Sequence, residues 1–86
     1  MKGKHIEIRA AEERVEVIVD DYELFDYVDD LLTGKGLEHE FTSEEERDGR
    51  IFYKMHFSGD VTQAQLSGVI ATIPRDEIER IWQMNN

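Results

Sequence analysis

The stretch from Leu37 to Phe57, LEHEFTSEEERDGRIFYKMHF, carries the fullest apolar row in the chain and decides how the fold is built. Apolar and polar residues alternate on both sides of a central polar segment that contains glycine. Period-two alternation is typical of a strand with one face on a core and the other in water. The stretch therefore predicts a β-hairpin. Its inward positions are Leu37, His39, Phe41 and Ser43 on the first arm, and Ile51, Tyr53, Met55 and Phe57 on the second.

The turn of this hairpin fixes which residues lie opposite each other. A two-residue loop, Asp48–Gly49, would place Phe41 opposite His56 and separate the two apolar rows onto different faces. A three-residue loop that begins at Arg47, with its glycine in the left-handed conformation, places Phe41 opposite Met55 instead. This second register gathers both apolar rows on one face. We therefore expect the three-residue loop.

Another hairpin precedes this one. Residues 5–10 and 15–19 alternate in the same way, with Glu12 and Glu13 at the tip. Two glutamates are poor residues for a tight hairpin turn, so a four-residue loop in the same register fits equally well. The expected register pairs Ala10 with Val15, Ile8 with Val17, Ile6 with Val19, and Arg9 with Glu16.

The clearest predicted helix follows the first hairpin. Asp20-Asp21 supplies an N-cap, and Glu23 lies three residues after Asp20, which is the spacing of a capping box. Gly34 and Gly36 end the helix, because glycine readily adopts the left-handed conformation of a C-cap. The apolar face of this helix consists of Leu24, Phe25, Val28, Leu31 and Leu32.

Two shorter helices complete the expected order of elements. Asp60 and Gln63 have capping-box spacing. The helix that they begin runs from about Val61 to Ile73, where Pro74 ends it. A last helix runs from Arg75 to Met84. The order ββα-ββα-α predicts an α+β fold with two layers, in which two hairpins form a four-stranded antiparallel sheet and helices pack on one face. We expect residues 1–86 to form a single domain of this kind.

Charge and composition narrow the functional classes. The chain holds 20 acidic and 10 basic residues, a formal net charge of −10. This balance repels nucleic acid and anionic membranes, so we expect neither as a direct partner. Because cysteine is absent, disulfides, thiol catalysis and cysteine-ligated zinc are excluded. No apolar run reaches the roughly 20 residues that span a bilayer. The N-terminus leads into a strand and not a signal peptide, so we expect a cytoplasmic protein.

Histidines are the candidate metal-binding nitrogens. On the expected register, Glu40 faces His56 on the outer side of the hairpin and Glu38 lies nearby, a set that suits a divalent ion. A solvated cross-strand pair is the preferred interpretation. His39 is expected to lie half-buried beside Phe57. No carboxylate falls at a buried position and no serine lies in a nucleophile elbow, so we expect no catalytic residue, no bound metal and no cofactor.

Acidic side chains concentrate on the outer face of the first helix and along the second hairpin. Carboxylates at intervals of several ångströms imitate a phosphate backbone and suit a basic groove. They also keep a small domain soluble, which is the simpler explanation. We expect a non-enzymatic binding module, such as an inhibitor or immunity-type protein that masks a basic, nucleic-acid-handling partner protein. The residues expected to meet that partner are Glu23, Asp26, Asp29, Asp30, Glu44, Glu45 and Glu46.

The last helix offers an alternative function. Ile78, Ile81 and Trp82 form a short apolar stripe that a second copy of the chain would bury. A homodimer is compatible with this pattern. The alternative is therefore a structural or assembly domain that associates with itself through Trp82, Ile78 and the exposed sheet edges.

Overall fold

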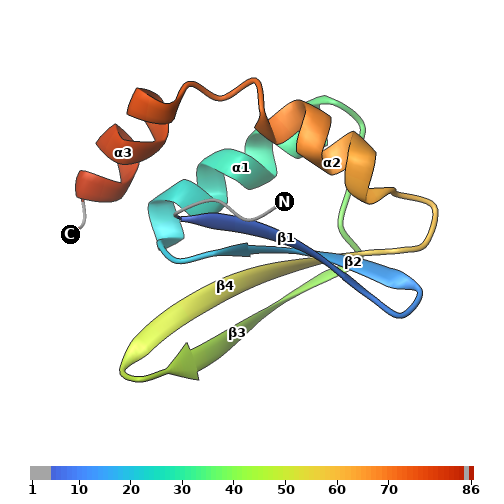
Figure 1. The fold of residues 1–86 in the computed structure, drawn as a ribbon, viewed down its shortest axis with the longest axis horizontal. Helices are drawn as coiled ribbons and strands as arrows, with labels where there is room; N and C mark the ends of the chain where they lie inside the picture. The colour runs from blue at the N-terminus through green and yellow to red at the C-terminus, as the bar shows by residue number, and fades with distance from the viewer. Residues whose placement is uncertain (1–4, 85) are drawn as a thin grey trace.

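The predicted order of elements is confirmed. The computed structural model describes residues 5–84 and 86, with the side chain of Ala11 left out. They form one α+β arrangement in the order ββα-ββα-α (Figure 1). Its elements are β1 (Ile6–Ala11), β2 (Arg14–Val19), α1 (Tyr22–Gly34), β3 (Phe41–Arg47), β4 (Arg50–Phe57), α2 (Gln63–Ile70) and α3 (Arg75–Gln83). None of the helices in the described part of the chain has the length and apolar character needed to cross a membrane.

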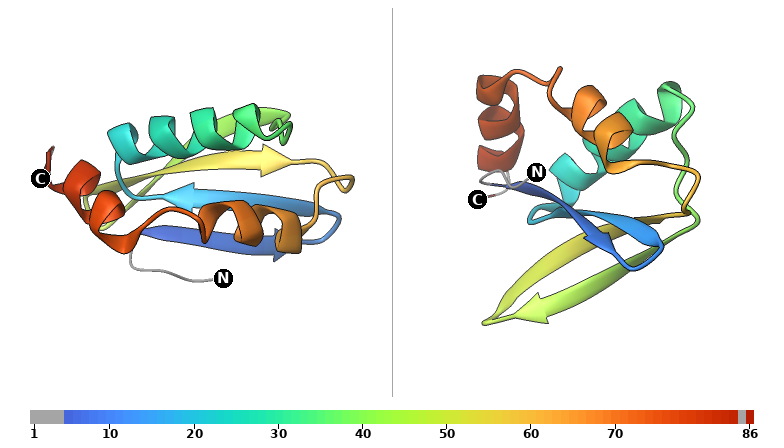
Figure 2. Two further views of the ribbon diagram at one scale, coloured as in Figure 1. Left: turned by 90° about the horizontal axis from the view of Figure 1, so that it is seen from above. Right: turned by 45° about the vertical axis from the view of Figure 1, so that its right-hand side comes forward.

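The strands form one antiparallel sheet in the order β1-β2-β4-β3, so that β1 and β3 are its edges. The three helices lie on one face of the sheet, where α2 and α3 follow one another alongside α1 (Figures 1 and 2). Of these, α1 contacts β2 and β4, whereas α2 contacts β1. The turn end of the β3–β4 hairpin projects away from the helix layer (Figures 1 and 2). The first residues of α1 therefore lie opposite the part of β4 that the helices do not cover.

The first hairpin has the predicted register. Ile6 pairs with Val19, and Ile8 pairs with Val17. The tip is the tight two-residue form, in which Glu12 adopts the positive φ of 56° that such a turn requires of a residue at its centre. Alternation decides this register, because the inward rows of β1 and β2 both lie under the helices.

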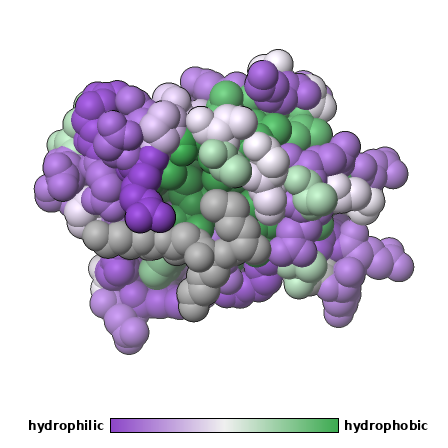
Figure 3. All heavy atoms as spheres, turned by 45° about the horizontal axis from the view of Figure 1, so that its top comes forward, coloured by the Kyte–Doolittle hydropathy of each residue, from purple (hydrophilic) through white to green (hydrophobic). Residues whose placement is uncertain are grey.

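The core lies between the sheet and the helix layer. Seen from the helix side, apolar side chains gather in the middle of the molecule and hydrophilic side chains surround them (Figure 3). The hydrophobic effect makes this burial the main source of stability. The buried core residues are Ile6, Ile8, Val15, Val17, Val19, Leu24, Val28, Leu32, Met55, Phe57, Leu66, Ile70, Ile73 and Ile81.

The predicted register of the second hairpin is wrong. Phe41 lies opposite His56, and the turn is the two-residue Asp48–Gly49 loop. Both turn residues have positive φ, 52° and 81°, which is the type I′ geometry that matches the twist of the flanking strands. Met55 is fully buried as expected, but Phe41 points to the outer face and is 47% exposed. The segment that contains Leu37 is a loop before the strand and not part of it.

The cause of this difference is the position of β3 at the edge of the sheet. Because the hairpin projects beyond the helices, neither face of β3 is covered by them (Figure 1). An uncovered strand has no inward face for its apolar residues to match, so the turn alone decides the register. The assumption that both arms of the hairpin face one core is therefore incorrect.

The N-cap of α1 is Asp21, one of the two aspartates predicted for it, and its side chain accepts a hydrogen bond from the backbone of Leu24 at 2.9 Å. Both boundaries of α2 differ from the prediction. The N-cap of α2 is Thr62, which forms a complete capping box with Gln65. This helix ends at Ile70, and the residues between it and Pro74 form turns instead of a further helical segment.

Candidate functional site

Five of the seven carboxylates predicted to meet a partner are exposed and lie on the helix side of the molecule. Glu44 lies opposite Tyr53, and Tyr53 lies opposite the buried Val19. Because cross-strand partners share a face, the side chain of Glu44 points to the helix side of the sheet, and that of Glu46 does the same. Among the described residues, none of the five carboxylates forms an ion pair. We call this surface the acidic face, and it consists of Glu23, Asp26 and Asp30 of α1 with Glu44 and Glu46 of β3.

The other two predicted carboxylates are held by ion pairs within the chain. Asp29 lies 3.2 Å from Nδ1 of His39. Glu45 points to the outer face of the sheet, where Nζ of Lys54 donates to it at 2.6 Å and the guanidinium of Arg47 donates to it as well. The pKa of Glu45 is lowered mainly by the hydrogen bond from Lys54 and, to a smaller extent, by the hydrogen bond from Arg47. These two side chains are less available to a partner than the five of the acidic face.

The lowered pKa of Glu45 predicts how its replacement by glutamine changes stability with pH. A carboxyl with a lower pKa in the folded state stabilises the fold above its unfolded pKa, which is 4.5 for an ordinary glutamate. That contribution is lost as the pH falls through the lowered value. Glu45→Gln should therefore reduce the melting temperature slightly at about pH 7, and this difference should shrink below 4.5. Circular dichroism melts at several pH values measure it, and a difference that persists at about pH 3 would contradict the assignment.

Aromatic and apolar side chains lie between the α1 and β3 parts of the acidic face. The rings of Tyr22 and Tyr53 meet edge-on with centroids 5.4 Å apart, and Phe25 lies 5.7 Å from Tyr53. Tyr22 is 57% exposed and Ile51 is 42% exposed. Exposed aromatic residues inside a polar rim are typical of the centre of a protein–protein interface.

An open hollow of about 530 Å³ adjoins these aromatic residues. It lies between the first residues of α1 and the first residues of β4, where the second hairpin diverges from the helix layer. The hollow is thus a direct result of the uncovered end of the sheet. Its lining consists of Asp20, Asp21, Tyr22, Glu23, Gly49, Arg50, Ile51, Tyr53 and Asn86.

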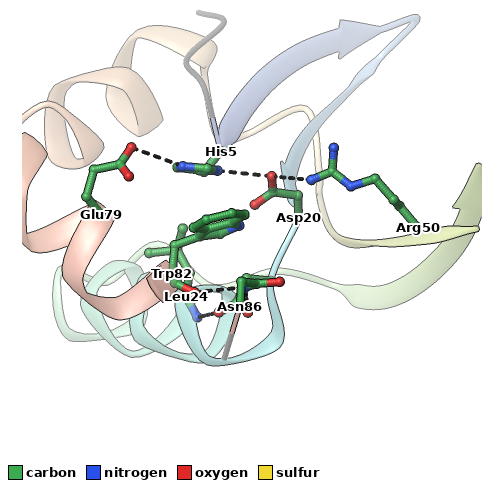
Figure 4. A network of polar contacts seen from close by, with 8 residues as sticks. His5, Asp20, Leu24, Arg50, Glu79, Trp82 and Asn86 are labelled. Atoms are coloured by element: carbon green, nitrogen blue, oxygen red, sulfur yellow. Dashed lines mark hydrogen bonds and ion pairs between the residues drawn. The ribbon is translucent and has the colours of Figure 1, made fainter. Parts of the chain in front are cut away.

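A network of polar contacts joins α3 to the sheet (Figure 4), and two of its residues, Asp20 and Arg50, line the hollow. Nδ1 of His5 lies 3.0 Å from Oδ2 of Asp20, and Nε2 lies 3.1 Å from Oε1 of Glu79. Each ring nitrogen of His5 therefore lies within hydrogen-bond distance of one carboxylate oxygen. Trp82 stacks on His5 with ring centroids 4.5 Å apart. The network therefore connects the start of β1, the end of β2 and α3.

Arg50 connects this network to the hollow. Its guanidinium donates to the same Oδ2 atom of Asp20 at 2.9 Å. The side chain of Asp20 is only 6% exposed, whereas that of Arg50 is 57% exposed. Within the described part of the chain, Oδ1 of Asp20 and Nε1 of Trp82 are buried without a hydrogen-bond partner. The buried carboxylate thus has spare capacity to accept hydrogen bonds.

The two residues predicted to contact a second copy of the chain pack within this one. Trp82 lies against His5, and Ile78 packs at the margin of the core. Ile81, the third residue of the stripe, is buried in the core itself. The remaining large apolar side chain at this end is Met84, which is 65% exposed. Association through Trp82 and Ile78 stays a prediction.

The histidine of the second hairpin lies in a polar cluster on the outer face of the sheet. Oγ of Ser43 lies 2.7 Å from Nε2 of His56, and Oε1 of Glu16 lies 3.5 Å from Nδ1. Phe41 stacks flat on the ring with centroids 4.2 Å apart. The cluster contains a serine, a histidine and a carboxylate in hydrogen-bond sequence, as a catalytic triad does. However, the ring of Phe41 shields the histidine and the sheet face around it is open. We therefore interpret the cluster as a set of contacts between neighbouring strands. The backbone N–H of Glu40, the predicted neighbour of His56, donates to the carbonyl oxygen of His56 at 2.8 Å, but the Glu40 side chain lies 3.7 Å from Arg14.

The described residues bring together no group of three or more histidine, aspartate or glutamate side chains that could hold a metal ion. His39 lies edge-on to Phe57 with centroids 6.2 Å apart, which confirms its predicted neighbour. The hollow and the His5 network are the two features that the sequence interpretation missed. No family model, no curated protein and no solved structure matches this chain. Its function is therefore inferred from its own residues.

Proposed function

We propose that this protein is a non-enzymatic binding module that docks its acidic face onto the basic surface of a partner protein. The observation that carries the proposal is the pairing state of the carboxylates. The five on the acidic face have no cationic partner among the described residues, whereas those on the outer sheet face, Glu7, Glu16 and Glu45, lie in contacts with Arg9, His56 and Lys54.

The two kinds of side chain on this face have separate roles in binding. Unpaired carboxylates produce a negative potential that accelerates the encounter with a basic surface. The exposed ring of Tyr22 and the half-buried ring of Tyr53 supply the apolar contact that holds the complex once it forms. An inhibitor or immunity-type protein that covers the nucleic-acid-binding surface of a cytoplasmic enzyme is the most concrete form of this function.

Charge reversal on the acidic face tests the proposal. A partner captured from the native host and identified by mass spectrometry should bind the variant Asp26→Lys/Asp30→Lys about tenfold more slowly at low salt, because local steering is lost. The salt dependence of the association rate should also flatten. Stopped-flow mixing over a salt series measures both effects.

A matched control separates local steering from net charge. Glu13→Lys/Asp60→Lys makes the same change in net charge at two exposed residues outside the acidic face. This control should retain most of the association rate of the native chain. If both variants bind the partner at the native rate, or if both slow it equally, the acidic face is not the docking surface.

Self-association is the alternative function, and one observation favours it. Met84 is 65% exposed beside α3. A second copy that met this end of the molecule would cover it. Sedimentation velocity separates the two functions, because a monomer at micromolar concentration excludes the alternative.

A further inference from the structure

The hollow beside the acidic face has the composition of a receptor for a cation. Its volume of about 530 Å³ falls within the range of sites that hold small ligands, roughly 300–1,000 Å³. Three carboxylates line it: Asp20, Asp21 and Glu23. Tyr22 and Tyr53 form an aromatic wall beside them. Carboxylates and aromatic rings together favour guanidinium and ammonium groups, through charge-assisted hydrogen bonds and cation–π contacts.

The chain itself shows which cation fits. The guanidinium of Arg50 lies at the hollow and donates to Oδ2 of Asp20. Asp20 is more than nine-tenths buried, and its Oδ1 atom has no hydrogen-bond partner among the described residues. The carboxylate is thus fixed in place, with Oδ2 as the atom that meets the guanidinium, whereas Arg50 is mostly exposed. Because the Arg50 end of this ion pair is exposed while the Asp20 end is held in place, another guanidinium can compete with Arg50 for Oδ2 of Asp20.

We propose that the hollow receives an arginine side chain of the basic partner, and that Arg50 occupies the place of that guanidinium in the free protein. This inference rests on the proposed function, since it names the group by which the partner is recognised at the end of the acidic face. The partner's arginine replaces Arg50 at Asp20 and lies against Tyr22. Bidentate donors and a flat cationic surface make guanidinium better suited to this site than the ammonium of lysine.

Removing Arg50 tests the inference without the partner. The probe is Nα-acetyl-arginine-N-methylamide, titrated against the ¹⁵N-labelled full chain and followed by nuclear magnetic resonance. The native chain should bind it weakly, with a dissociation constant of about 1 mM, and signals around the hollow should shift. Arg50→Ala should bind it about two- to fivefold more tightly, because the internal competitor is gone.

Two controls make the result specific. Arg47 lies opposite Arg50 at the hairpin turn, and both guanidinium groups lie over the ring of Phe52, at 4.7 Å and 5.5 Å from its centroid. Arg47 pairs with Glu45 on the outer face, whereas Arg50 pairs with Asp20. Arg47→Ala therefore makes the same change in net charge and should bind the probe as the native chain does. The acetyl-citrulline analogue, which has the shape of arginine without its charge, should not shift the signals. Arg50→Gln serves as a second variant that keeps the length of the side chain.

Equal affinity of the Arg50→Ala and Arg47→Ala variants for the probe would overturn the inference, and so would equal binding of the citrulline analogue. Stronger binding of the lysine analogue than of the arginine probe would also overturn the choice of guanidinium. The outcome is independent of the Asp26 and Asp30 experiment. If the hollow binds the probe but the charge reversal at Asp26 and Asp30 leaves partner binding unchanged, the arginine site stands and docking through the acidic face does not.

Discussion

Replacing Phe57 by alanine is expected to lower the free energy of unfolding by about 3–5 kcal/mol. Phe57 is fully buried and is among the largest side chains of the core. It lies on β4 opposite Val15, where truncation would leave a cavity between the sheet and the helices. A domain of this size has a total stability of roughly 5–15 kcal/mol, so the loss removes a large part of it. Urea titration followed by circular dichroism measures the change.

Phe41 provides the matched control for this prediction. Phe41→Ala removes the same atoms from a side chain that is 47% exposed and stacked on His56. Its expected cost is about 1 kcal/mol, because only a surface stacking contact is lost. The comparison also tests the register of the second hairpin. If both variants lost similar stability, Phe41 would have to lie inside, opposite Met55, and the two-residue turn would be incorrect.

Replacing His5 by alanine is expected to cost about 3 kcal/mol and to loosen α3. The substitution removes one donor from the buried carboxylate of Asp20, leaving Arg50 as its remaining ion-pair partner there. It also removes the contact with Glu79 and the ring on which Trp82 stacks. Trp82 is the single tryptophan of the chain, so its fluorescence reports directly on the docking of α3.

Two further variants separate the hydrogen bonds of His5 from its ring contact and from the general effect of removing a histidine. His5→Phe keeps a ring against Trp82 but donates no hydrogen bond, and it should still lose most of the stability that His5→Ala loses. His39→Ala removes a histidine that is 25% exposed in its side chain and pairs with Asp29 at 3.2 Å, and it should cost less than 1 kcal/mol. Similar losses for His5→Ala and His39→Ala, with unchanged tryptophan emission, would show that the network does not hold α3.

The sequence predicts those parts of the fold in which the apolar residues of a strand or helix all face the core between the sheet and the helices. The first hairpin is the clearest case, because both of its inward rows face the helices and alternation alone sets the pairing. Helix α1 follows from its apolar stripe in the same way. The second hairpin fails because β3 lies outside the covered area, where the chemistry of the Asp48–Gly49 turn prevails over the pattern of faces.

Part of the candidate site can also be predicted from the sequence, and part of it cannot. Exposed carboxylates of α1 can be located from helical spacing, but their ion pairing depends on contacts between distant elements, as for Asp29 and His39. One part of the missed network was within reach. Extending the register of the first hairpin by one pair beyond Ile6 and Val19 places His5 opposite Asp20, and their backbones are indeed hydrogen-bonded at 3.2 Å. The contribution of α3 lies 74 residues away in sequence and has no local signal.

The edge position of β3 affects how readily the protein aggregates at high concentration. A strand whose backbone is unpaired on one side is the usual starting point for ordered aggregates. Glu44, Glu45 and Glu46 lie in succession on this strand, so two copies that aligned here would bring six carboxylates together. Mutual repulsion between these carboxylates therefore opposes edge-to-edge pairing of two copies, and the glutamates that we propose meet a basic partner also hinder the formation of fibres.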